Sequence, residues 1–164
     1  MIHRRDGLAA LFDAESPGVF GFLLLRCGSR ALAEDLMAET FAQASGLFSK
    51  GRGHEVTASW LRTVARRRLI DHWRRQGTAR EGLAKLAQAT KPSPAPDTDP
   101  DGRVEMALNA MSDRQRAVLV LRYLDGFSTS EVAEAIGSSY KATESLLGRA
   151  RAAFRASYEG ATDG

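Results

Sequence analysis

Basic side chains are concentrated in residues 50–80, together with rings that can stack on nucleic-acid bases. This segment carries nine basic and two acidic residues, with Trp60, His72 and Trp73 among them. Arginine and lysine neutralise phosphates and aromatic rings support unstacked bases, so the combination is typical of a nucleic-acid site. Two alternatives stay open: the tryptophans belong to a hydrophobic core, or the arginines only keep a helix soluble.

A second segment, residues 138–154, has the pattern of a helix that reads a DNA major groove. On a wheel of about 100° per residue, one arc of about 140° collects its small and apolar residues. This packing side consists of Ala142, Thr143, Leu146, Leu147, Ala150, Ala153 and Phe154. The other side carries Lys141, Glu144, Ser145, Gly148, Arg151 and Arg155. Polar and cationic groups on that side suit base edges and phosphates, although an ordinary solvated helix has the same pattern.

The residues in front of this helix predict a helix-turn-helix. Ser128 and Glu131 have the spacing of a capping box, which satisfies the free amides at a helix start. Gly137 can adopt the left-handed conformation that ends a helix, and Ser138 or Ser139 can cap the next one.

Nothing in the chain predicts catalysis. The three histidines are scattered, and the sequence contains no nucleophile elbow, phosphate-cradling glycine loop or H-E-x-x-H motif. Cys27 is the only cysteine, which excludes an intrachain disulfide and a cysteine-based metal site. We therefore expect a protein that is not an enzyme and has no cofactor and no metal.

Charge is distributed unevenly along the 164 residues, although the net charge is only +3. Residues 6–48 contain two basic and six acidic side chains, and residues 81–113 contain three basic and six acidic side chains. This asymmetry predicts a polyanion at one segment and a different partner at another. No uninterrupted apolar run approaches the length of a bilayer span, and the N-terminus lacks the apolar core of a signal peptide. We expect a cytoplasmic protein without membrane insertion.

The elements that position these residues are all predicted to be helices. An N-terminal four-helix bundle is expected from helices over 7–14, 17–26, 31–48 and from about 58 to 75, with a weak helix over 77–89. Four of the five prolines and three aspartates lie in residues 91–102, which predicts an acidic linker. Four helices form the C-terminal module. They are expected over 103–111, over 112–124, between Ser128 and Gly137, and over 138–154. The predicted architecture is all-α, with domains at 1–80 and 104–164 and a flexible linker at 81–103.

The basic helix has three sides, and its sequence does not say which one meets a ligand. Leu61, Ala65 and Leu69 step by four and predict a core side. Arg67, Asp71 and Arg74 share a second side. A third side holds Arg62, Arg66 and Trp73.

The chain resembles an RNA polymerase sigma factor of the extracytoplasmic-function class of the sigma-70 family. The resemblance covers about residues 8–156 and depends on three motifs, which follow one another in the order expected of the family. Ala33-Glu-Asp-Leu-Met-Ala-Glu-Thr-Phe41 resembles the helix that binds the polymerase clamp. Trp60-Leu-Arg-Thr-Val-Ala-Arg-Arg-Arg-Leu-Ile-Asp-His-Trp-Arg-Arg75 resembles the helix that reads the minus-ten element. Met111-Ser-Asp-Arg-Gln-Arg116 through Leu146-Leu-Gly-Arg-Ala-Arg151 resembles the domain that reads the minus-thirty-five element.

The resemblance implies a transcription initiation factor with three sets of contact residues. Clamp helices of the largest polymerase subunit would contact Glu34, Asp35, Glu39 and Gln43. Minus-ten DNA would contact Lys50, Arg52, Arg66, Arg67, Asp71, Arg74 and Arg75. Minus-thirty-five DNA would contact Ser139, Lys141, Glu144, Ser145, Arg149 and Arg151. Further implied partners are the flap of the second-largest subunit and an anti-sigma factor, and the linker would thread toward the active-site cleft.

Four positions depart from the family pattern. Arg67 stands where asparagine is frequent, Glu144 and Leu146 stand where basic residues are frequent, and Ala38 replaces a frequent glutamine. Two other functions stay open: a free-standing helix-turn-helix regulator that uses only residues 108–154, and a helical adaptor that binds no DNA. An acidic docking helix followed by a basic helix favours the sigma factor, because a plain regulator needs neither.

Overall fold

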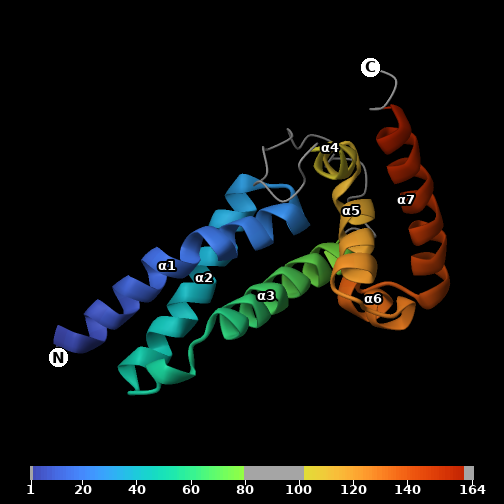
Figure 1. Cartoon of the computed structure of the whole chain (residues 1–164). Helices are drawn as coiled ribbons and strands as arrows, with labels where there is room; N and C mark the ends of the chain where they lie inside the picture. The colour runs from blue at the N-terminus through green and yellow to red at the C-terminus, as the bar shows by residue number, and fades with distance from the viewer. Residues whose placement is uncertain (1, 80–101, 161–164) are drawn as a thin grey trace.

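The computed structural model describes residues 2–79 and 102–160, and every regular element in these two ranges is a helix (Figure 1). The N-terminal part contains α1 (Ile2–Cys27), α2 (Arg30–Ser49), the short 3₁₀ turn η1 (Gly53–Glu55) and α3 (Ala58–Ala79). The C-terminal part contains α4 (Arg103–Asn109), α5 (Asp113–Leu119), the π-helical turn η2 (Val120–Leu124), α6 (Thr129–Ile136) and α7 (Tyr140–Gly160). The all-α fold class is confirmed. Of the predicted linker, all but residues 102 and 103 lie outside the described ranges, as does most of the weak helix over 77–89.

The first helix of the N-terminal part differs from the prediction, because the two helices expected before Arg26 are a single helix. Pro17 lies inside α1 rather than at the start of a new helix. A proline removes one backbone hydrogen bond and favours a break. Here Leu8 and Leu11 before it, and Val19 and Leu23 after it, all pack against the same core. Tertiary packing on both sides of the proline therefore keeps the helix continuous, and the described N-terminal part has three long helices instead of four.

Two helices run further than their sequences predict. α3 continues to Ala79 past the expected end at Arg75, and α7 continues to Gly160 where fraying was expected from Ser157. Residues 161–164 lie outside the described part of the chain.

Side-chain hydrogen bonds cap the starts of α2, α3 and α7, whereas the helix start expected at Pro17 is absent. The Ser29, Thr57 and Ser139 hydroxyl oxygens accept from backbone N–H groups three residues ahead, at 3.2, 3.1 and 3.1 Å. Ser128 and Glu131 form the complete capping box, and Gly137 ends α6 with φ +67°. The Ser112 hydroxyl oxygen likewise accepts from the Gln115 backbone N–H at the start of α5.

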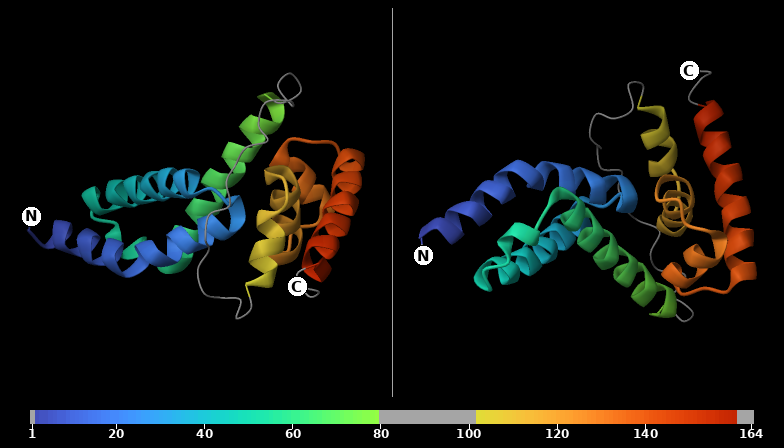
Figure 2. Two further views of the ribbon diagram at one scale, coloured as in Figure 1. Left: turned by 90° about the horizontal axis from the view of Figure 1, so that it is seen from above. Right: turned by 60° about the horizontal axis from the view of Figure 1, so that its bottom comes forward.

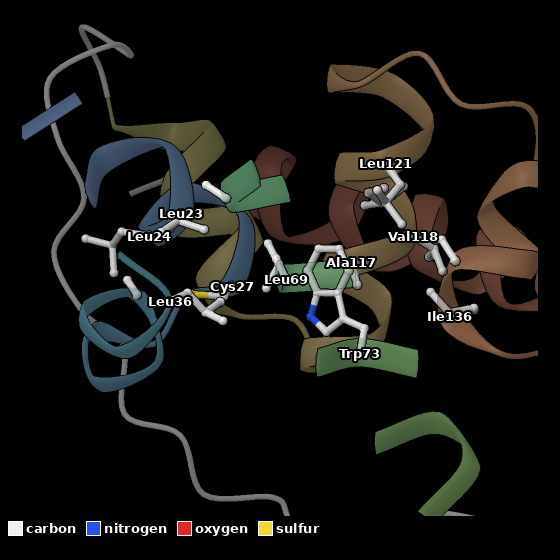
Figure 3. Close-up of a cluster of buried hydrophobic side chains, with 14 of the residues drawn as sticks. Leu23, Leu24, Cys27, Leu36, Leu69, Trp73, Ala117, Val118, Leu121 and Ile136 are labelled. Carbon is white, nitrogen blue, oxygen red and sulfur yellow. The ribbon is translucent and has the colours of Figure 1, made fainter. Parts of the chain in front are cut away.

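The hydrophobic core extends without a break through both parts of the chain. Figure 3 shows Leu69 and Trp73 of α3 lying between Leu23 of α1 on one side and Ala117 of α5 on the other. α3 also packs against α6, and α1 against α5, so the two parts of the chain lie against each other (Figure 2).

Helix α1 contains the one stretch of the described chain that is long and apolar enough to cross a membrane. This stretch, Arg5–Cys27, has a mean hydropathy of 1.5 over its best window. Core helices of soluble proteins share this length and composition. Asp13 and Glu15 interrupt the stretch, and charges at that depth of a bilayer are costly. Its second half supplies Val19, Leu23 and Leu24 to the core, as expected of a helix in a bundle.

Candidate nucleic-acid interface

Helix α3 presents one row of charged side chains to solvent. Arg67, Asp71 and Arg74 follow one another at helical spacing and all are exposed, as is the neighbouring Arg75. The Arg75 Nε donates to the Asp71 carbonyl oxygen over 3.3 Å. The row combines cations that neutralise phosphate with a carboxylate that can accept from a base amino group.

The loop in front of α3 is held close to the N-terminal bundle. A Cβ at Gly53 would lie 2.6 Å from the Phe48 ring, so only glycine fits at this approach. Gly51 has φ +75°, a conformation that favours glycine. Lys50 and Arg52 project from this loop and are exposed. The loop therefore displays two cations from a fixed backbone.

Arg52 is already paired within the loop. Its guanidinium donates to both carboxylate oxygens of Glu55 over 2.6 and 2.7 Å. These hydrogen bonds lower the pKa of the Glu55 carboxyl and raise the pKa of Arg52. Both groups are in water, so a phosphate can compete for Arg52 at little cost.

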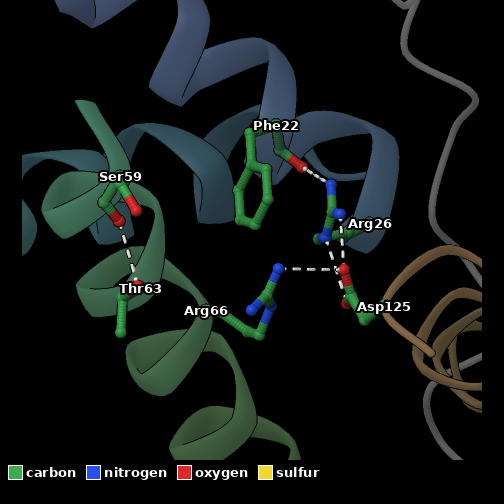
Figure 4. Close-up of polar contacts among 6 residues, drawn as sticks. All are labelled: Phe22, Arg26, Ser59, Thr63, Arg66 and Asp125. Carbon is green, nitrogen blue, oxygen red and sulfur yellow. Dashed lines mark hydrogen bonds and ion pairs between the residues drawn. The ribbon is translucent and has the colours of Figure 1, made fainter. Parts of the chain in front are cut away.

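Arg66 was expected to contact minus-ten DNA together with the exposed row, but it lies on another side of α3 and is engaged elsewhere. Its Nη2 donates to the Asp125 carboxylate of the C-terminal part over 3.2 Å (Figure 4). Trp73, on the same side of α3, is only 7% exposed. This third side of the helix, which the sequence left unassigned, packs against the C-terminal part, while exposed Arg62 lies beyond the contact.

The aromatic rings of the basic segment are not open platforms for bases. Trp73 is buried, and Trp60 is half-buried and packs against the core. The interpretation as a core residue is therefore confirmed for Trp73, whereas Trp60 is only partly buried against the core. Burial and the nearby Arg75 lower the pKa of the His72 imidazole, which favours its neutral form.

Helix α7 presents the second candidate surface. Thr143, Leu147 and Ala150 are buried as predicted, whereas Ala142 on the predicted packing side is exposed. All predicted contact residues are exposed, namely Ser139, Lys141, Glu144, Ser145, Arg149 and Arg151. α7 lies at the edge of the C-terminal part furthest from α3 (Figure 1).

One of these residues is oriented by a neighbour that the sequence did not single out. The Arg151 Nη1 donates to the Tyr123 hydroxyl over 2.9 Å. Tyr123 also lines an apolar groove of about 180 Å³ with Val104, Leu108, Leu119, Val120, Leu124 and Phe154. Leu124 at its rim is 55% exposed, so the C-terminal part has an apolar surface beside its polar helix face.

The acidic surface predicted on α2 is present and lies next to α3. Glu34, Asp35, Glu39 and Gln43 are all exposed. Arg30 pairs with Glu34 over 3.2 Å. Arg68 of α3 donates to Gln43 over 3.0 Å and lies 3.9 Å from Glu39. Asp35 is exposed and forms no ion pair or side-chain hydrogen bond within the described residues. It is therefore the carboxylate of this surface that a partner can reach most readily.

Residues at the contact between the two parts are the ones that the sequence patterns miss. Asp125 precedes Gly126, and this dipeptide by itself indicates only a turn, while Arg26 and Arg116 have no predicted role. In the structure Arg26 donates to Asp125 over 2.6 Å, and Arg116 donates to the Leu25 carbonyl oxygen over 2.6 Å. Both arginines are less than 10% exposed. The only available signal was that each arginine adjoins apolar residues of its helix, and it is a weak one.

No group of three histidine, cysteine or carboxylate side chains in residues 2–79 and 102–160 is arranged to hold a metal ion. Cys27 is 5% exposed, and its Sγ donates to the Ser29 carbonyl oxygen over 3.3 Å. Burial raises the pKa of this thiol and keeps it protonated. Cys27 is therefore a core residue.

Two family models match the chain in succession. Residues 11–79 match sigma-70 region 2, and residues 101–154 match the model described as sigma-70, region 4. The ECF RNA polymerase sigma factor SigM of Bacillus subtilis is 31% identical over 85% of this chain and 88% of its own length. The ECF RNA polymerase sigma factor BldN of Streptomyces coelicolor is 30% identical over 88% of this chain, which spans 58% of the length of BldN.

Among solved structures, the sigma factor RpoE in complex with the anti-sigma factor NepR, from Bartonella quintana, is 22% identical with a TM-score of 0.49. That match covers 92% of this chain and 96% of that chain.

Proposed function

The chain belongs to the extracytoplasmic-function class of the sigma-70 family, and on that premise we propose that it binds core RNA polymerase and directs it to specific promoters. It reads the minus-ten and minus-thirty-five elements and helps to open the DNA. The role is non-enzymatic: the protein supplies binding surfaces, and the polymerase supplies the chemistry. We place this activity in the cytoplasm.

The observation that carries the proposal is the adjacency of two exposed surfaces of opposite charge in the N-terminal part. The acidic surface of α2 includes Asp35 and Glu39, and the basic row of α3 includes Arg67 and Arg74. Arg68 connects the two helices between these surfaces. A factor that joins a polymerase to DNA needs both surfaces in one rigid unit, whereas a free-standing regulator needs only the helix-turn-helix.

The basic row is suited to the melted minus-ten strand. Unstacking a base costs a few kcal/mol, so the strand must gain contacts when the duplex opens. We assign phosphate binding to Lys50, Arg52, Arg74 and Arg75, and recognition of an unstacked base to Arg67 and Asp71. Because Trp73 is buried and Trp60 packs against the core, charge and hydrogen bonding hold the strand in place of aromatic stacking.

Helix α7 is suited to the duplex minus-thirty-five element. Lys141, Arg149 and Arg151 supply cations, and Glu144 can accept a hydrogen bond from a cytosine amino group in the major groove. Glutamate repels phosphate, so this residue favours a base contact over a backbone contact.

The apolar groove beside Tyr123 gives the C-terminal part a second attachment to polymerase. An apolar groove with exposed side chains at its rim is suited to an amphipathic helix. We propose that the flap of the second-largest subunit occupies it. An anti-sigma factor is the regulatory partner that family membership implies, and the domain division at 1–80, 81–103 and 104–164 forms part of the same proposal.

Run-off transcription with purified core polymerase on genomic fragments tests this function. We expect discrete start sites that appear only when this protein is added. Tight binding to duplex DNA without polymerase, with no transcripts in its presence, would instead establish a free-standing regulator that uses residues 108–154.

A further inference from the structure

Helix α7 contains a single glycine before its last residue, Gly148, and nothing in the described part of the chain requires a glycine there. A glycine inside a helix is less favourable than alanine, because it loses more conformational freedom on folding. The Gly148 backbone is helical, without the positive φ that favours glycine. Apart from its chain neighbours and the backbone of its own helix, no atom lies within 4 Å of the position that its Cβ would take. The packing of the free protein therefore does not explain this glycine.

Other glycines of the chain show the difference. Gly28 has φ +68°, and a Cβ at Gly53 would lie 2.6 Å from the Phe48 ring, so their own surroundings explain them. Open space alone does not indicate a ligand, since Gly18 inside α1 has it as well. What distinguishes Gly148 is its position on its helix.

Gly148 lies near the centre of the exposed side of α7. The opposite side is held in the core by Leu147 and Ala150, which are 2% and 0% exposed. On a wheel of about 100° per residue, Gly148 is about 40° from Glu144 and about 60° from Ser145. Both of these neighbours are exposed. The predicted minus-thirty-five residues thus surround a patch of bare backbone.

A bare patch at this place lets the helix lie closer to DNA. A helix with its side chains is about 10–12 Å across and the major groove is about 12 Å wide, so the fit leaves little space. A side chain at the centre of the inserted side meets the bases first, and even a methyl group extends about 1.5 Å from the Cα. Without any side chain at this position, the helix axis can approach the base edges by a similar distance.

Glu144, one turn before Gly148, is the residue that gains most from a close approach. Its carboxylate is attached through two methylene groups, whereas an arginine carries its guanidinium on three. A short acceptor must have its backbone near the base edges before it can bond a cytosine amino group. Because phosphate repels glutamate, a helix held further out leaves Glu144 without a partner on the DNA.

We propose that Gly148 sets the depth at which α7 enters the major groove, and that this depth brings Glu144 within hydrogen-bond reach of a cytosine amino group. Gly148 is a specificity-determining residue of the minus-thirty-five surface, although it has no side chain. This role rests on the proposed function, because it requires α7 to lie in the groove. The glycine lowers the stability of the free protein and raises its selectivity for DNA.

Selection from a library of duplexes with a randomised segment, by the complex of core polymerase with this protein, tests the role of Gly148. We expect the wild type to enrich a C·G pair at one position, and we expect Glu144→Gln and Gly148→Leu to lose that preference. Gly148→Leu should bind the duplex selected by the wild type roughly tenfold more weakly, since the contact to the base is lost. Gly148→Ala should lie between the two, because its side chain is smaller.

Urea unfolding of the same variants separates this effect from a loss of folding. Gly148→Ala and Gly18→Ala should both raise the urea midpoint, because alanine is the better helix former. Only Gly148→Ala should lose DNA affinity. Gly18 is the matched control, since it is exposed inside α1, has open space at its Cβ position and belongs to a helix without predicted DNA contacts.

The outcomes distinguish this role from the proposed function. If Gly148→Leu keeps both the affinity and the cytosine preference of the wild type, the role of Gly148 is wrong and the proposed function stands. The same holds if the wild type selects a site without a cytosine preference that depends on Glu144, or if Gly18→Ala loses as much affinity as Gly148→Ala. A wild-type complex that enriches no sequence contradicts the proposed function and the role of Gly148 together.

Discussion

Arg26 and Asp125 lie 99 residues apart in the chain, yet the Arg26 Nη2 donates to the Asp125 Oδ1 over 2.6 Å. This pair connects the end of α1 to the turn after α5. It explains why one side of α3 is hidden: the basic helix lies beside the pair and contributes Arg66 to it. Three sides of α3 therefore have three uses, since one packs in the N-terminal core, one contacts the C-terminal part and one faces solvent.

Gly28→Ala is expected to destabilise the protein by about 2 kcal/mol. Gly28 has φ +68°, where a side chain costs about 1–2 kcal/mol, and its new Cβ would lie 2.8 Å from the Arg116 Nη1. Gly46→Ala is the matched control, because Gly46 is inside α2 with no atom near its Cβ position. That change should stabilise by about 0.5–1 kcal/mol. Urea unfolding measures both, and equal effects would contradict the close approach of Arg116.

Arg116→Leu is expected to cost about 3 kcal/mol of unfolding free energy. The substitution leaves the Leu25 carbonyl and the Asn109 side-chain oxygen without their charged donor in a buried site. Arg114→Leu on the same helix, where the side chain is only half-buried, should change stability by no more than about 0.5 kcal/mol. Chemical denaturation followed by circular dichroism compares them. A loss as large for Arg114 would show that α5 depends on its total charge and not on this contact.

The Cys27 thiol is expected to make the folded protein less stable at alkaline pH. Burial raises its pKa above the ordinary 9.0. The folded state therefore holds the proton more tightly than the unfolded chain, so this stabilisation is complete below pH 9.0 and is lost as pH rises through the folded-state pKa. The difference in stability between wild type and Cys27→Ala, measured from pH 7 to 11, isolates the effect. A constant difference across that range would contradict the burial of the thiol.

Asp35→Asn combined with Glu39→Gln should weaken binding to core polymerase roughly tenfold, because both changes remove charge from the exposed surface of α2. The control combines Glu134→Gln with Glu159→Gln, two exposed carboxylates of the C-terminal part. Biolayer interferometry with immobilised core enzyme measures all three proteins. Unchanged affinity in the α2 double variant would remove the polymerase contact from this helix.

Local signals in the sequence predicted the helix-turn-helix correctly. Ser128 and Glu131 bond each other's backbone groups within four residues, and Gly137 ends the helix by its own conformational freedom. Neither feature depends on distant parts of the chain. The exposed rows of α3 and α7 follow from helical periodicity in the same way.

Long-range contacts were beyond the reach of the sequence. The continuity of α1 through Pro17 depends on packing at both ends of the helix, and local propensity favours a break there. The burial of Trp73 and the pairing of Arg66 with Asp125 depend on where the C-terminal part lies, which a helical wheel does not contain. The dipeptide Asp125-Gly126 indicates only a turn. The two partners of Asp125, Arg26 and Arg66, lie 99 and 59 residues away in the chain, so no local pattern reveals them.

Permanganate footprinting of a promoter recognised by this protein tests the central claim most directly, because it detects unpaired thymines. We expect reactive thymines at the minus-ten element only when core polymerase and this protein are both present. Arg74→Ala with Arg75→Ala should abolish that reactivity and lower the salt dependence of DNA binding by about two phosphate contacts, while core binding persists. Arg62→Ala, an exposed arginine elsewhere on α3, should retain it. Full reactivity in the double variant, or reactivity without this protein, would contradict the assignment of DNA opening to the exposed row of α3.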